Sequence, residues 1–200
     1  MSAHPEQQTG AAPPHAVPAG DFADAFTRRL LLHRGLTTEL LEQHIRRPLR
    51  VQVRTQSLSS SRAGDQRLVR LLHLTPGSPR LVRRTELVTP EGTVVSRNVV
   101  TGRLPRDGEL VAAVTSRLLP LGRAVAATGV PHRRARLTSG LSDWPGPGGP
   151  LPAVTRGYLL HMDGEFPLHV EETFNPALVS PGQRRGGVPA GGHRLLGTAP

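Results

Sequence analysis

The chain has 200 residues, a formal net charge of +10 and no cysteine. This length suits one domain with a core of its own, and the missing thiols exclude both a disulfide framework and a thiolate metal site. No apolar run approaches the roughly 18 residues that span a bilayer, and the N-terminal stretch lacks the basic-then-apolar order of a secretory signal. These features predict a cytoplasmic protein with no membrane partner.

All 25 basic residues are arginine, and they occur in ones and twos along the chain. The chain has one tryptophan, one tyrosine and four phenylalanines, so a platform for stacking bases is hard to build. Nucleic-acid binding would rest on charge alone, and an anionic small molecule suits that charge at least as well. We therefore expect a small-molecule partner, no nucleic acid, and a monomer or weak dimer.

Composition divides the chain into a folded part and two tails. Residues 1–20 and 181–200 are rich in Pro, Gly and Ala and cannot bury enough apolar surface to become ordered. We expect a disordered N-terminal tail at 1–20, one domain at 21–180 and a flexible C-terminal tail at 181–200.

The first half of the domain reads as helices followed by strands. Asp21 can cap a helix that ends near Gly35, and Thr37 or Thr38 can cap a second short helix. Residues 48–56 alternate apolar and arginine or glutamine side chains, which is typical of a half-buried strand. Residues 64–74 predict a short helix before a turn.

Two hairpins dominate the rest of the domain. Strands at 80–88 and 93–102 flank Pro90-Glu91-Gly92, and runs at 153–162 and 165–174 flank Asp163-Gly164, a strong hairpin signal. Between them we expect a helix near 107–119, a short helix after 122, and a Gly/Pro loop at 139–152. The order predicts an α+β fold: a single domain with a mostly antiparallel sheet of about six strands and helices covering one face.

Glu172 stands out in the last predicted strand. Alternate side chains of a strand share a face, so Glu172 lies in line with Leu168, Val170 and Phe174. An ionised carboxylate there costs several kcal/mol unless it is paired or neutralised. Three explanations are open: the strand frays before Glu172, a buried arginine pairs with it, or desolvation raises its pKa and suits it to proton transfer.

Arginines also occur in apolar patterns. Arg97 shares a strand face with Val95 and Val99, and Arg84 shares one with Val82 and Glu86. A buried guanidinium needs an anion, either a protein carboxylate or the carboxylate of a small organic acid. A cross-strand pair between Glu86 and Arg97 is the structural alternative.

Other motifs are weak. The nine histidines show no metal-ligand spacing, and the chain has no phosphate-binding loop, dinucleotide fingerprint or nucleophile elbow. We therefore expect no metal and no cofactor. The densest basic cluster, Arg133, Arg134 and Arg136, is typical of a solvated face.

Four segments together resemble the chorismate pyruvate-lyase family, which forms 4-hydroxybenzoate. They are "HRGLTTEL", "LVRRTELVTPEGTVVSRNVV", "LLPLGRAV" and "LLHMDGEFPLHVEETFNP". Each is short, and their order and spacing over about 25–178 carry the likeness. The resemblance implies an antiparallel sheet of about six strands, with the ligand buried under two helical flaps.

The resemblance also implies roles for particular residues. Glu172 matches the catalytic glutamate, and Arg84 matches the arginine that holds the aromatic carboxylate. Arg84 is preferred over the adjacent Arg83 because it shares a face with Glu86. The backbone at Leu121 and the flap residue Leu36 match ligand contacts, and Arg97 matches an arginine of the second strand.

The implied function is a lyase that eliminates pyruvate from chorismate, a dicarboxylate, to give a hydroxybenzoate in aromatic or secondary metabolism. Arginines would hold the substrate carboxylates, and a buried glutamate would assist one proton transfer. One alternative is a non-catalytic module that binds small acids, similar to the effector domain of GntR-type regulators, although residues 1–20 cannot form their winged helix. Another is a different lyase or dehydratase acting on a related cyclohexadiene acid.

Overall fold

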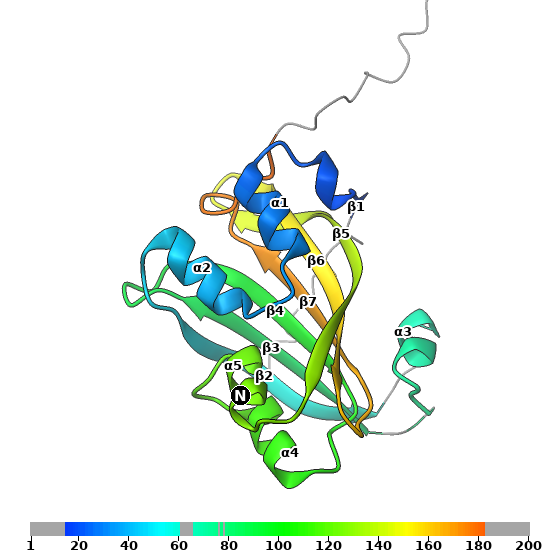
Figure 1. Ribbon diagram of the computed structural model, residues 1–200. Helices are drawn as coiled ribbons and strands as arrows, with labels where there is room; N and C mark the ends of the chain where they lie inside the picture. The colour runs from blue at the N-terminus through cyan, green and yellow to red at the C-terminus, as the bar shows by residue number, and fades with distance from the viewer. Residues whose placement is uncertain (1–14, 61–65, 76, 78, 183–200) are drawn as a thin grey trace, which may run out of the picture.

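The computed structural model describes residues 15–60, 66–75, 77 and 79–182. One antiparallel sheet, with strand order β1-β5-β6-β7-β4-β3-β2, forms the centre of the molecule (Figure 1). Its strands are β1 (His15–Ala16), β2 (Arg50–Ser60), β3 (Pro79–Val88), β4 (Val94–Gly102), β5 (His132–Gly146), β6 (Gly149–Met162) and β7 (Leu168–Phe174). The predicted α+β fold with an antiparallel sheet is confirmed.

Two helix pairs cover one face of the sheet, which we call the inner face (Figure 1). The elements are α1 (Ala25–Leu32), α2 (Thr37–Ile45), α4 (Gly108–Thr115) and α5 (Leu121–Ala127), with a 3-10 turn η1 (Ala19–Asp21) before them. Helix α1 begins later than predicted. Asp24 rather than Asp21 is its N-cap, because the Asp24 carboxylate accepts the Thr27 backbone N–H at 2.6 Å.

Each helix pair has its own apolar cluster against the sheet. Leu30 and Leu41, from α1 and α2, are fully buried with Phe174 of β7. Leu110 and Val125, from α4 and α5, belong to a second cluster that includes β3, β4, β6 and β7 side chains. Burying such side chains contributes about 1.5–3 kcal/mol each. The strip of sheet between the clusters is where polar residues face inward.

The short helix α3 (Gln66–Leu71) lies on the other side of the sheet, away from the two helix pairs (Figure 1). Leu72 and Leu74, which follow it, pack with Leu159 of β6. Leu159 alternates with the inward-facing Tyr158 and Leu160, so this third cluster covers part of the outer face.

The segment expected as a loop at 139–152 is part of a long hairpin instead. Strands β5 and β6 stay paired to Gly146 and Gly149, where Gly149 has φ +119°. The end of this hairpin nearest its turn, from Ser142 to Ala153, pairs with no other described strand. Proline is tolerated there because a strand with only one neighbour does not need every N–H for the ladder.

The expected tails lie largely outside the described residues. Residues 1–14 and 183–200 are not described, so the prediction for them stays untested. Within the expected N-terminal tail, His15 and Ala16 pair with β5, and Val17 is buried. The sheet of the described chain therefore starts at His15.

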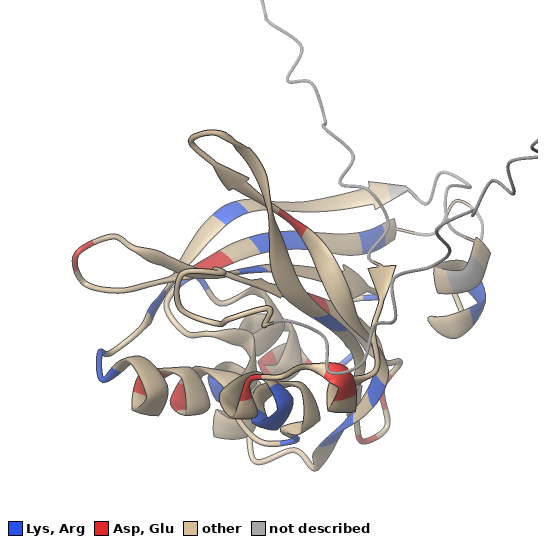
Figure 2. Cartoon of the chain, turned by 90° about the horizontal axis from the view of Figure 1, so that it is seen from above, with Lys and Arg blue, Asp and Glu red and all other residues tan. Residues whose placement is uncertain are grey.

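Basic residues occur on strands and helices alike (Figure 2), as their scattered positions in the sequence suggest. No helix of the described chain has both the length and the apolar character needed to cross a bilayer.

Candidate ligand-binding site

A small cavity lies on the inner face, between the two helix pairs. Its volume is about 40 Å³, which holds only a few water molecules. Helices α2 and α5 line one side, and residues of strands β2 to β7 line the other. Apolar residues form much of its lining: Leu36, Val51, Leu87, Val100, Leu121 and Val170. The polar residues are Thr37, Thr38, Arg83, Thr85, Asn98, Arg134, Tyr158 and Glu172.

Arg83 is the most deeply buried charge at this cavity. Its exposed fraction is 1%. Its guanidinium donates to the backbone carbonyls of Val114, at 2.5 Å, and of Ser116, at the end of α4. Its Nε atom is buried without a hydrogen-bond partner, and within the described chain it forms no ion pair. Burial, and then the charge of Arg117, lower the pKa of Arg83.

Arg84, the expected ligand arginine, lies on the opposite face of the sheet. Arg83, Thr85 and Leu87 alternate toward the cavity, so Arg84 points outward and is exposed. Its charge acts on Glu171 of β7, another outward-facing residue. The predicted role of Arg84 would require a ligand on the outer face.

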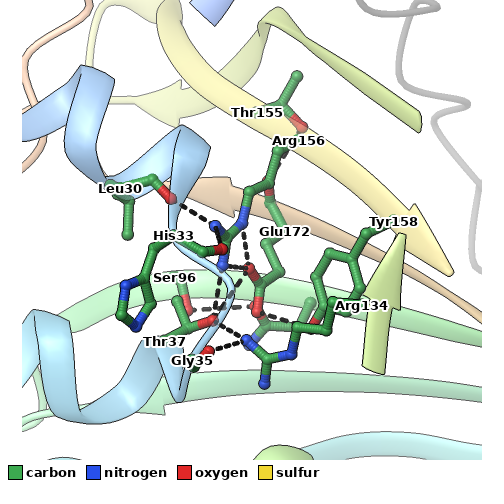
Figure 3. Close-up of polar contacts among 11 residues, drawn as sticks. Leu30, His33, Gly35, Thr37, Ser96, Arg134, Thr155, Arg156, Tyr158 and Glu172 are labelled. Carbon is green, nitrogen blue, oxygen red and sulfur yellow. Dashed lines mark hydrogen bonds and ion pairs between the residues drawn. The ribbon is translucent and has the colours of Figure 1, made fainter. Parts of the chain in front are cut away.

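Glu172 forms a buried ion pair with Arg156, which faces it directly on β6 (Figure 3). Both Nε and Nη2 of Arg156 lie 2.7 Å from Glu172 Oε2. The second explanation offered for Glu172, pairing with a buried arginine, is the one that the structure contains. Arg156 also donates to the carbonyls of Leu30 and His33 and to the Thr37 hydroxyl. It therefore joins the sheet to the end of α1 and the start of α2.

Two further side chains surround this pair (Figure 3). The Tyr158 hydroxyl donates to Glu172 Oε1 at 3.4 Å. Burial, and then the Glu172 charge, raise the pKa of Tyr158, so its hydroxyl stays protonated. Arg134 lies over the Tyr158 ring at 5.1 Å and donates to the Gly35 carbonyl and the Thr37 hydroxyl.

The remaining predicted residues divide between the two faces. Leu36 and Leu121 line the cavity, as does Glu172. Arg97 lies on the outer face, where its Nε is 3.1 Å from Glu86 and its guanidinium is 4.7 Å from the Trp144 ring. The alternative of a cross-strand pair between Glu86 and Arg97 is what the structure contains.

Arg156, Arg134, Tyr158 and Thr37 are residues of this site that sequence reasoning did not select. Arg156 had the same signal as Glu172, because it lies in line with Val154, Tyr158 and Leu160 in an alternating strand. Arg134 was grouped with Arg133 and Arg136 as a solvated cluster, yet it is half-buried. Within the described residues, no group of three or more His, Asp or Glu side chains could hold a metal ion.

No family model matches the chain, and no curated protein matches it. Among solved structures, PhnF from Mycobacterium smegmatis is similar, with a TM-score of 0.55 and 15% identity over 74% of this chain and 67% of that one. The effector domain of the same protein gives a TM-score of 0.50 and 15% identity, over 72% of this chain and 90% of that domain. At this identity the likeness shows the fold.

A third similar structure is the ligand-binding domain of a protein described as a GntR-family transcriptional regulator from Bordetella bronchiseptica. It has 13% identity over 70% of this chain and 91% of that domain, and its TM-score of 0.41 is too low to support an argument.

These comparisons correct the expected activity. The chorismate lyase-like fold is confirmed, but the prediction of a chorismate pyruvate-lyase is wrong, because the similar structures are PhnF and its effector domain rather than a lyase. The expected chorismate substrate, its pyruvate and 4-hydroxybenzoate products and the place in aromatic biosynthesis are withdrawn with it. Glu172 contacts Arg156, Thr37 and Tyr158 at this site, and its predicted catalytic role stays a prediction.

Proposed function

We propose that this chain is a non-catalytic module that binds a small organic anion in the cavity between α2 and α5. The observation that carries the proposal is Arg83, a guanidinium that is 1% exposed and has no carboxylate partner within the described chain. A buried charge is costly unless it is paired. A guanidinium has five N–H donors, and the two carbonyl contacts of Arg83 leave donors for an anion.

The lining favours a compact apolar ligand that carries a carboxylate. Leu36, Val100, Leu121 and Val170 offer apolar contacts around the buried, unpaired guanidinium of Arg83. Arg134 adds a second cation to the lining, and a guanidinium can hold a carboxylate through two parallel hydrogen bonds. Benzoate has this combination of a flat apolar ring and one carboxylate.

Binding must move the helices, because a cavity of about 40 Å³ is far below the roughly 300 Å³ of typical ligand pockets. The sheet side is fixed by strand pairing, whereas α2 and α5 are joined to each other by an ion pair of Glu42 with Arg123 at 2.5 Å. We propose that α2 or α5 shifts outward when a ligand enters. Such a shift is what an effector-type module needs in order to report an occupied site.

Calorimetric titration with benzoate and with benzyl alcohol tests the proposal. Benzoate should bind saturably and benzyl alcohol should not, because only benzoate supplies an anion for Arg83. Arg83→Lys keeps the charge but loses the paired donors, and should weaken benzoate binding about tenfold. Arg84→Lys is the matched control on the outer face and should bind as the wild type does. Equal affinity for benzoate and benzyl alcohol would contradict the proposal, and so would an equal loss of benzoate affinity in Arg83→Lys and Arg84→Lys.

A further inference from the structure

A second hollow lies outside the cavity, between the C-terminal end of α1 and strands β5 and β6. Its volume is about 420 Å³, within the range of small-molecule sites. We call it the arginine groove, because most of its polar lining is basic. The basic residues are His33, Arg34, Arg133, Arg134, Arg136 and Arg156.

The charges of this groove are almost uncompensated. No aspartate or glutamate occurs among its lining residues, all of which are described. Arg156 is paired with Glu172, whereas the hydrogen bonds of Arg134 go to a carbonyl and a hydroxyl, both of them neutral acceptors. Within the described chain, Arg34 and Arg136 form no ion pair. Like charges held close together repel one another, and a bound anion would remove that cost.

His33, the histidine that lines this groove, responds to the same electrostatic field. Burial first, and then the charges of Arg156, Arg134 and Arg29, lower the pKa of His33, while a hydrogen bond with Leu36 opposes them. No carboxylate contributes to this shift, which agrees with a net positive potential in the groove.

The basic residues come from two opposing walls. His33 and Arg34 follow α1, and Arg134 and Arg136 belong to β5, where both alternate toward the inner face. Two walls of guanidinium groups suit a compact anion that lies between them and is charged on more than one side. A flat patch with interleaved aromatic rings would suit a nucleic-acid strand better, and Tyr158 is the one aromatic residue of this lining.

We propose that the arginine groove is a second anion-binding site, which holds a small oxyanion carrying at least two negative charges, of the pyrophosphate type. It adjoins the cavity at Arg134 and Tyr158, which line both hollows. The proposal does not depend on the ligand of the cavity.

Titration calorimetry of the full chain with sodium pyrophosphate, at constant ionic strength, tests it. Saturable binding is expected for pyrophosphate and none for acetate, because a single charge cannot engage both walls. The double variant Arg34→Gln/Arg136→Gln should bind pyrophosphate at least tenfold more weakly, since each lost charge-assisted contact costs about tenfold in affinity. Both side chains are exposed, so folding should be unaffected.

The matched control is Arg50→Gln, an exposed arginine on β2 at the opposite edge of the sheet. It should bind pyrophosphate as the wild type does. The double variant should also keep wild-type affinity for benzoate, because neither residue lines the cavity; this separates failure of the groove from failure of the proposed function.

Three results would overturn the proposal. The first is the absence of saturable pyrophosphate binding. The second is equal weakening in Arg50→Gln and in the double variant, which would reflect net charge alone. The third is a DNA duplex that binds more tightly than pyrophosphate at the same salt concentration and loses that affinity in the double variant, which would assign the groove to nucleic acid.

Discussion

Arg156 and Glu172 lie directly opposite each other on β6 and β7 and form a buried ion pair with atoms 2.7 Å apart. The pair lies beside the cavity and also connects the sheet to α1 and α2 through Leu30, His33 and Thr37. The glutamate that seemed out of place in an apolar pattern is therefore a structural partner. Among the described residues that line the cavity, Arg83 is the deeply buried charge without an ion-pair partner.

Breaking this pair should destabilise the fold strongly. Glu172→Gln leaves the Arg156 charge buried without a counter-charge, which typically costs about 3–5 kcal/mol. Urea unfolding should show this loss in Glu172→Gln and a smaller loss in the double variant Arg156→Met/Glu172→Leu, where neither charge remains. Glu171→Gln, one residue away on the outer face, is the control. A loss below about 1 kcal/mol in Glu172→Gln would contradict the assigned role.

The stability of the chain should depend on pH through Glu171. Burial raises the pKa of Glu171, and the charge of Arg84 opposes this only in part. A raised pKa means that the folded state binds the proton more tightly than the unfolded state does. The free energy of unfolding of the wild type, relative to Glu171→Gln, should be highest below pH 4.5 and fall as the pH rises through the folded-state pKa. A difference that is constant with pH, or that increases, would contradict this.

The ion pair between Glu42 and Arg123 should control how easily the cavity opens. Arg123→Gln releases α5 from α2 but removes a pair that is partly exposed, so the global stability should change by no more than about 1 kcal/mol. Hydrogen exchange of the α5 amides should speed up, and benzoate should associate faster. Arg47→Gln removes the exposed contact with Glu91 at 3.9 Å and should change neither rate. Unchanged exchange in Arg123→Gln would argue against a moving helix.

Gly140 should be essential for the attachment of β1. A Cβ at this position would lie 2.1 Å from the His15 carbonyl oxygen, so Gly140→Ala must displace the N-terminal strand. Loss of the β1 pairing exposes Val17, and the free energy of unfolding should fall by about 2 kcal/mol. In contrast, Gly148→Ala has no atom within 4 Å to clash with and should leave stability nearly unchanged. Equal stability of the two variants would show that β1 adjusts without cost.

The sequence was sufficient for the inward direction of Glu172 and for both hairpins. Alternation along β7 and the Asp163-Gly164 turn are local signals, and local signals determine which residues share a face. Local signals could not decide whether Arg83 or Arg84 faces the cavity. Both faces of β3 carry buried apolar residues, because the outer face is itself partly covered, so alternation alone could not tell which arginine meets the cavity.

The prediction of a loop at 139–152 was wrong for a related reason. Prolines and glycines argue against a central strand, but from Ser142 to Ala153 β5 and β6 extend beyond the other described strands and need only each other as partners. The convergence of Arg83, Arg134 and Glu172 depends on strand order in the sheet. No local pattern contains that order, since β7 inserts between β6 and β4.

The most direct test of the central claim is the NMR signal of the Arg83 Nε–H group while benzoate is added, with the signal assigned by its absence in Arg83→Lys. If the buried guanidinium of Arg83 holds the ligand, its Nε–H resonance should shift to a new bound position while that of Arg84 stays in place. An unshifted Arg83 signal at saturating benzoate, or an equal shift at Arg84, would show that the anion binds elsewhere and that the cavity is not the ligand site.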